Sequence, residues 1–168
     1  MTTHESVRHR RVATPTKDLD RFEHHVRRGT PGSHAYVILL GLDTFDPAAL
    51  LRAVKKGLSY RTFERFRRNT SLSFERVSVL IDISRRTMTR RKREGRFLPD
   101  ESDRLLRASR LFARTLELFE GDRDAATEWL TTAQPSLGGT VPLDLAKSEL
   151  GAREVEQLIG RLEHGVFS

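Results

Sequence analysis

The chain has 168 residues, 37% of them hydrophobic, no cysteine and a formal net charge of +7 at pH 7. The lack of cysteine excludes a disulfide framework, a thiolate metal site and a cysteine nucleophile, and it fits the reducing cytoplasm. The longest apolar run is AYVILL at residues 35–40, far shorter than the roughly 20 residues that cross a bilayer. We therefore expect a cytoplasmic protein with no membrane partner, built from modest helical cores.

The charge is divided unequally along the chain. Residues 1–100 carry 22 Lys and Arg against 11 Asp and Glu, a balance of +11, whereas residues 101–168 carry 8 against 12, a balance of −4. A basic half followed by an acidic half suggests two partners of opposite charge, the first of them nucleic acid. The alternative is that most of these charges form an ordinary solvated surface.

Residues 1–33 show almost no apolar periodicity and end in the turn sequence TPGS. This composition predicts a flexible basic arm. The pair His24 and His25 lies in it, but no regular spacing recurs and no carboxylate cluster joins them. We therefore expect no metal site there.

From residue 46 the apolar spacing predicts four consecutive amphipathic helices. The first has Asp46 as its N-cap and Pro47 at its first helical position, and the fourth ends at Gly95. Only residues 82–84 separate the last two, which predicts a helix-turn-helix. The expected helices span residues 46–58, 59–69, 73–81 and 85–94.

Five positions of that last pair fit the helix-turn-helix of DNA-binding proteins. Its first helix has apolar Val77 and Ile81 on one side, with the small Ser78 where the two helices approach. Ile83 fills the turn, and Met88 is the single apolar inward residue of the second helix.

Two positions of the pair depart from the usual pattern. Asp82 stands where the turn commonly has glycine, and Asp tolerates the left-handed conformation better than most residues. Arg91 stands where an apolar residue is usual, and we expect its stem to lie along the core with its charged head in water.

The acidic half is also helical in pattern. Leu105, Ala108, Phe112 and Leu116 belong to one apolar stripe of a long helix at residues 100–119. No stretch alternates with period two, so the predicted fold is all-α, with AYVILL as the ambiguous segment. Further helices are expected at residues 122–130, 142–151 and 152–165, with a loop at residues 134–142.

The sequence offers little for catalysis. The carboxylates lie mostly on exposed helix faces, and the loop LGGT at residues 137–140 has neither the lysine nor the spacing of a phosphate-binding loop. We therefore expect that the protein is not an enzyme and binds no cofactor.

Residues 39–168 resemble the Xre/ParS-like antitoxins of bacterial toxin–antitoxin modules. The most specific pieces are GRFLPDESDRLLR, PSLGGTVPLDL and GAREVEQLIGRLEHGVFS, in this order and spacing. The resemblance implies an Xre-like helix-turn-helix DNA-binding domain, at residues 34–98, and a helical toxin-binding domain, at residues 99–168. It also implies a RES-domain toxin that degrades NAD, an antitoxin that covers the toxin's active site and represses its own promoter, and no catalytic activity of the antitoxin.

With Met88 turned inward, about 100° per residue places part of the basic helix outward. Arg86, Arg90 and Arg93 then face the DNA groove, with Thr89 flanking them. We expect Ser84 and Arg85, at the helix start, to lie near a phosphate. A single helix-turn-helix reads only a few bases, so we expect a homodimer on near-palindromic operator DNA, within a larger toxin–antitoxin complex.

For toxin binding we select the end of the chain and a nearby loop, because the resemblance and the acidic charge agree there. Phe167, an aromatic residue near a free terminus, is suited to plug an apolar pocket of the toxin; the alternative is that it folds back on its own core. His164 departs from the aromatic residue often found there in the family. The selected residues are Leu137, Gly138, Gly139, Glu163, Gly165, Val166, Phe167 and Ser168.

Two other functions remain open from the sequence. One is a free-standing helix-turn-helix transcription regulator whose C-terminal half only dimerises. The other is a basic RNA-binding or structural protein. A toxin gene next to this one, or a preference for duplex DNA with a symmetric site, would discriminate among the three.

Overall fold

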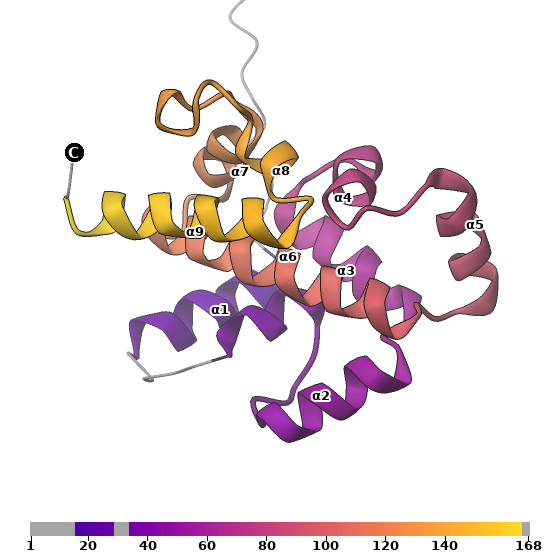
Figure 1. Ribbon diagram of the computed structural model, residues 1–168. Coiled ribbons are helices and arrows are strands. Elements are labelled where there is room, and N and C mark those ends of the chain that lie inside the picture. The colour runs from indigo at the N-terminus through magenta and orange to yellow at the C-terminus, as the bar shows by residue number, and fades with distance from the viewer. Residues whose placement is uncertain (1–15, 29–33, 166–168) are drawn as a thin grey trace, which may run out of the picture.

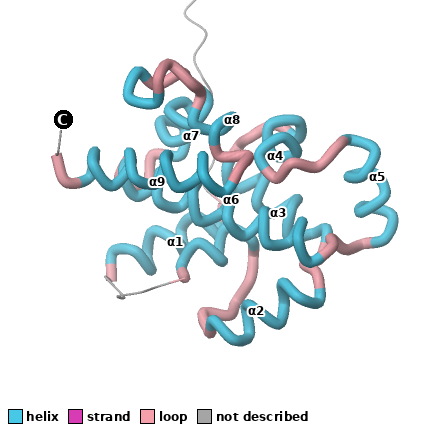
Figure 2. Tube along the Cα trace, in the orientation of Figure 1, coloured by secondary structure: helices cyan, strands magenta, loops and turns pink. Residues whose placement is uncertain are grey.

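The computed structural model describes residues 16–28 and 34–165, which form helices joined by loops (Figures 1 and 2). Among these residues there is no sheet, only two isolated β-bridges, so the all-α prediction is confirmed. The α-helices are α1 (Lys17–Arg27), α2 (Pro47–Lys56), α3 (Tyr60–Thr70), α4 (Phe74–Leu80), α5 (Arg85–Glu94), α6 (Pro99–Leu118), α7 (Arg123–Thr131), α8 (Pro142–Leu145) and α9 (Glu149–Glu163), and the 3-10 helices are η1 (Ala35–Leu40) and η2 (Pro135–Leu137).

Helix α6 is the central element of the fold. Its 20 residues give a rod of about 30 Å, and it packs against η1, α2, α3, α7 and α9 (Figure 1). The predicted apolar stripe is buried as expected, with Leu105 and Leu116 fully inaccessible to solvent. Because elements from both halves of the chain pack on α6, the two halves share one core.

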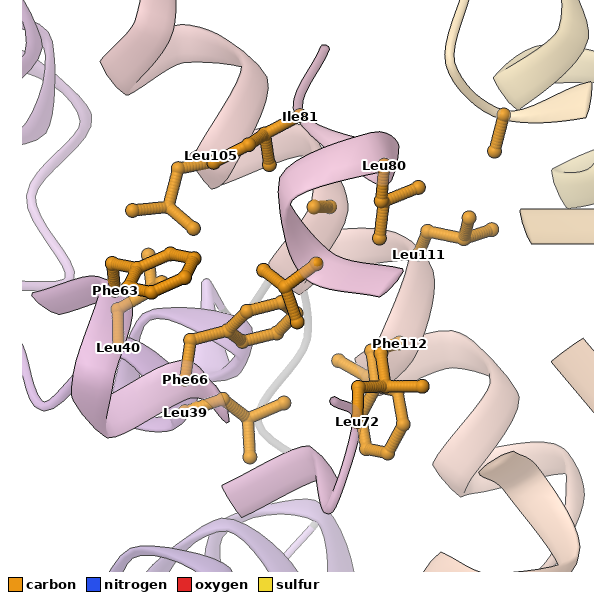
Figure 3. Packing of buried hydrophobic residues seen from close by; sticks show 14 of the residues in the cluster. Leu39, Leu40, Phe63, Phe66, Leu72, Leu80, Ile81, Leu105, Leu111 and Phe112 are labelled. Carbon is orange, nitrogen blue, oxygen red and sulfur yellow. The ribbon is translucent and has the colours of Figure 1, made fainter. Parts of the chain in front are cut away.

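That core is built from aromatic and branched side chains of distant segments (Figure 3). Phe66 of α3 meets Phe112 of α6 edge to face, with ring centroids 6.2 Å apart. Leu39 and Leu40 of η1 lie beside α3, and both are buried. The ambiguous run AYVILL is therefore a short helix enclosed by the core, which explains why its sequence shows no polar face.

The prediction of an arm over residues 1–33 is wrong for α1. Thr16 caps this helix by accepting the Leu19 N–H, and Leu19 and Phe22 are buried. The buried Asp18 accepts two hydrogen bonds from Arg65 of α3, at 2.7 and 2.8 Å. The helix is therefore held by tertiary contacts that its own composition does not reveal. Residues 1–15 and 29–33 lie outside the described residues.

The last two helices also differ from the prediction. Helix α8 has only four residues, and α9 begins at Glu149, earlier than expected, because Ser148 caps it by accepting the Gly151 N–H. The expected helix at residues 142–151 would end at Gly151. In the structure this residue lies inside α9, where a Cβ atom would overlap the Leu145 carbonyl oxygen, so this glycine permits close packing of α8 and α9. None of the described helices is long and apolar enough to cross a membrane.

Candidate functional site

Helices α4 and α5 are joined by a tight turn with the expected packing. Val77, Ile81 and Met88 are completely buried, and Ile83 is nearly so. Asp82 adopts the left-handed conformation, with φ of 52°, at the position where glycine is usual. The five predicted positions therefore occupy the places of a helix-turn-helix.

Helix α5 lies at the edge of the protein (Figure 1), and most of its basic side chains are exposed. Arg86, Thr89, Arg90 and Arg93 are exposed, and with Thr87 they line a shallow hollow of about 470 Å³. Among the described residues these arginines have no ion-pair partner. The structure thus brings the three predicted groove-facing arginines and the flanking Thr89 together on one surface.

The two residues selected at the start of α5 have different surroundings. Ser84 caps the helix: its hydroxyl accepts the Thr87 N–H and donates to the Thr87 hydroxyl. Arg85 lies on the flank of α5 with Lys92, beside a second hollow that α3 and α4 also line. Ser84 therefore orders the helix start, and Arg85 remains available to an anion.

The prediction that the charged head of Arg91 lies in water is wrong. Its side chain is 4% exposed, and its guanidinium binds both carboxylate oxygens of the 6% exposed Glu101, at 2.6 and 2.9 Å. Nη1 also donates to Glu94 at 2.6 Å. This buried pair ties α5 to the first turn of α6, and sequence spacing missed it because the partner lies beyond a turn, in the next helix.

The charges of this pair stabilise each other. Burial alone would raise the pKa of Glu101, but hydrogen bonds from Arg91 and from the Leu98 N–H hold that pKa below its usual range. The hydrogen bond to Glu101 raises the pKa of Arg91. Both groups are therefore ionised at neutral pH, and α5 is fixed to α6 by a charged contact.

The C-terminal end has a different electrostatic arrangement. Three arginines of α6 pair in order with three glutamates of α9: Arg107 with Glu149, Arg110 with Glu156 at 3.0 Å, and Arg114 with Glu163 at 3.0 Å. Since both sets of numbers increase together, the helices run parallel, and Figure 1 shows them side by side. We call these pairs the α6–α9 ladder.

The selected toxin-binding residues that the structure describes lie at the C-terminal end of α9 and in the loop that begins with η2. η2 packs against α9, which brings Leu137 to that helix, and Gly138 and Gly139 form an exposed left-handed turn. Glu163 is the last carboxylate of the ladder, and Gly165 ends the described chain in a left-handed conformation. Val166, Phe167 and Ser168 lie outside the described residues.

The two candidate surfaces are at opposite ends of α6. Helix α5 precedes its N-terminal end, whereas the C-terminal end of α9 lies beside its other end (Figure 1). A helix, a tight turn and a second helix with an outward basic face define a protein of the helix-turn-helix class.

Comparison with known proteins agrees with this class. The model of the antitoxin Xre-like helix-turn-helix domain matches residues 49–110. The model of the antitoxin Xre/MbcA/ParS C-terminal toxin-binding domain matches residues 115–165. Both matches include part of α6.

Two relatives carry the name "Antitoxin Xre". The one from Yersinia enterocolitica is 37% identical over 130 residues, which cover 77% of this chain and 88% of that protein. The one from Photorhabdus laumondii is 40% identical over 75 residues, 45% of this chain and about half of that protein, 51%. The chain belongs to the Xre antitoxin family.

Proposed function

We propose that this antitoxin binds its own promoter through α5 and neutralises a RES-domain toxin that degrades NAD, by covering the toxin's active site with its C-terminal end. It acts in the cytoplasm as a homodimer, within a larger complex with the toxin. The DNA-binding region is residues 34–98 and the toxin-binding region residues 99–168, and the two regions share the core around α6. The observation that carries the DNA part is the set of outward side chains on α5.

Those side chains suit DNA recognition. Arginine can donate two hydrogen bonds to a guanine in the major groove, and Arg86, Arg90 and Arg93 are exposed without ion-pair partners in the described chain. Because one short helix reads only a few bases, a useful operator requires two copies on a near-palindrome. The enclosed Arg91 sets the orientation of this helix against α6.

The DNA part is tested by Arg86→Ala combined with Arg90→Ala. We expect promoter retention in a gel shift to be abolished, since two base-reading groups are lost, each worth about 1–3 kcal/mol of discrimination. Binding of the toxin should be unchanged. The matched control is Lys147→Ala with Arg153→Ala, which removes the same charge from exposed positions near α8 and α9. Unchanged retention by the Arg86 and Arg90 variant would overturn the assignment of α5.

The toxin part is supported by the family match over residues 115–165. The residues that we propose for the contact are those selected from the sequence, from the η2 loop to the last residue. Phe167 is the expected anchor, because a few large side chains that fill pockets of the partner supply most of the binding energy at an interface.

Deletion of residues 165–168 tests this part. Cells that produce both proteins should stop growing, because the toxin's active site is no longer covered, while the shortened antitoxin keeps the helical circular dichroism of the full chain. Phe167→Ala should reproduce most of the loss, and Gln157→Ala, at an exposed position of α9 outside the selected set, serves as its control. Full protection by the shortened protein would reject the role of Phe167 and leave the DNA part untouched.

A further inference from the structure

We propose that Lys55 and Lys56, together with Arg96, form a second DNA contact that holds the phosphate backbone beside the groove entered by α5. This inference rests on the proposed DNA binding and extends its footprint beyond the helix-turn-helix. We call the three residues the basic flank.

The basic flank is brought together by a short antiparallel junction. Residues 58–60, which follow α2, run against residues 95–97, which follow α5: the Tyr60 N–H donates to the Gly95 carbonyl and the Phe97 N–H to the Leu58 carbonyl, both at 2.9 Å. The last turn of α2 therefore lies next to the C-terminal end of α5. Figure 1 shows the C-terminal end of α2 on the same side of the molecule as the turn after α5.

This junction is close-packed, so the flank keeps a fixed position relative to α5. Gly57 has a φ of 88°, and a Cβ atom there would overlap the Phe97 carbonyl oxygen. The Leu58 N–H donates to the buried Ser102 hydroxyl at 2.8 Å, which ties the junction to α6 as well. Arg96 spans the junction, because its Nη1 donates to the Lys56 and Gly57 carbonyls at 3.2 and 2.8 Å.

Although Arg96 also bridges the junction, acidic side chains of the described residues do not neutralise the charge of the basic flank. Lys55, Lys56 and Arg96 are exposed, and no carboxylate among the described residues pairs with them. The hydrogen bonds of Arg96 use Nη1 alone, which leaves Nη2 and Nε to donate to a phosphate. By contrast, Arg104, Arg107, Arg110 and Arg114 of α6 each have an acidic partner.

The position suits a phosphate rather than a base. The major groove is about 12 Å wide, so a helix lying in it has a sugar-phosphate strand on each side. Cations fixed next to the end of that helix meet the strand and not the base edges. Lysine then acts as a point charge and arginine as a fork for phosphate oxygens, contacts that raise affinity for any sequence.

The test measures how DNA affinity depends on salt. The full-length variant Lys55→Gln with Lys56→Gln is titrated onto promoter DNA and onto a scrambled duplex at several KCl concentrations, with fluorescence anisotropy as the readout. Each lost phosphate contact reduces the slope of log K against log salt by about 0.9, so we expect a reduction of about 2. Affinity should fall by the same factor for both duplexes, because the contact reads no sequence.

Two further variants separate the outcomes. Lys147→Gln with Arg153→Gln removes equal charge elsewhere and should leave the slope unchanged. Arg96→Gln should reduce the slope by about 1, but it can also disturb the junction, so the lysine variant decides. If the lysines only stabilise the end of α2, the melting temperature falls while the slope stays the same, which overturns the inference. If the unmodified protein does not bind the promoter, the proposed function fails first.

Discussion

The two ends of α6 use arginine in opposite ways. Beside its N-terminal end, Arg86, Arg90 and Arg93 of α5 face solvent without a described partner. From the middle of α6 to its C-terminal end, each arginine of the α6–α9 ladder is joined to a carboxylate of α9. Uncompensated like charges repel one another and disfavour a compact state. The unpaired arginines of α5 therefore do not stabilise the folded protein. Pairing with a carboxylate, rather than exposure alone, therefore separates the cations that stabilise the fold from those that we propose for DNA binding.

Arg91 is the sharpest case, because it lies on α5 but belongs with the paired cations. Arg91→Met leaves Glu101 charged and nearly inaccessible to solvent, and breaking a buried pair in this way costs about 3–5 kcal/mol. We expect that loss in the free energy of unfolding, measured with urea and circular dichroism. This is the largest effect that we predict for the stability of the protein.

The control replaces both partners. Arg91→Met with Glu101→Leu removes the pair without leaving a charge behind, and such apolar replacements are often neutral, so most of the lost stability should return. Arg90→Met, one residue away and exposed, should cost less than about 0.5 kcal/mol. A cost this small for Arg91→Met would show that its head reaches water after all.

Acid should weaken the paired contacts and spare the basic face of α5. Hydrogen bonding to Arg65 and Asn69 holds the pKa of Asp18 below its usual range against the effect of burial, and the pKa of Glu101 is lowered as well. Groups with a lowered folded-state pKa stabilise the protein above their unfolded values, about 4, and lose this contribution as the pH falls through the folded-state pKa.

We therefore expect the urea midpoint to be steady from pH 7 to about 5 and to fall below about pH 4. The variant with both Arg91→Met and Glu101→Leu should show a shallower fall. It has lost the contribution of Glu101 to acid sensitivity and keeps that of Asp18. An equally steep fall in that variant would mean that Glu101 contributes nothing to acid stability.

Much of the helical fold could be predicted from local signals. Asp46 caps its helix as expected, Ser73 and Ser84 cap theirs in the same way, and the stripe of α6 is long enough to define its buried face. These features depend on neighbours within one or two turns, which a sequence shows directly. The outward positions of α5 follow from the same periodicity, since Met88 alone sets the inward side.

What could not be predicted depends on residues far apart in the chain. Asp18 meets Arg65 across 47 positions, and that contact helps to hold a helix whose sequence has few apolar residues. Arg91 meets Glu101 across a turn, where periodicity indicates only that an apolar residue would be usual. Gly151 is needed for the close approach of Leu145, which its own neighbours do not indicate. In each case tertiary packing overrides the local signal.

The smallest predicted effect tests the paired side of the comparison. In a double-mutant cycle, Arg110→Ala and Glu156→Ala should couple by about 0.2–1 kcal/mol in the free energy of unfolding, the usual range for a partly exposed pair, and the coupling should shrink in high salt. Arg93→Ala with Glu156→Ala is the control and should show none, because Arg93 has no described partner. Equal coupling in both cycles would mean that the α6–α9 ladder acts only through the overall charge of the protein, and the distinction between the two ends of α6 would then disappear.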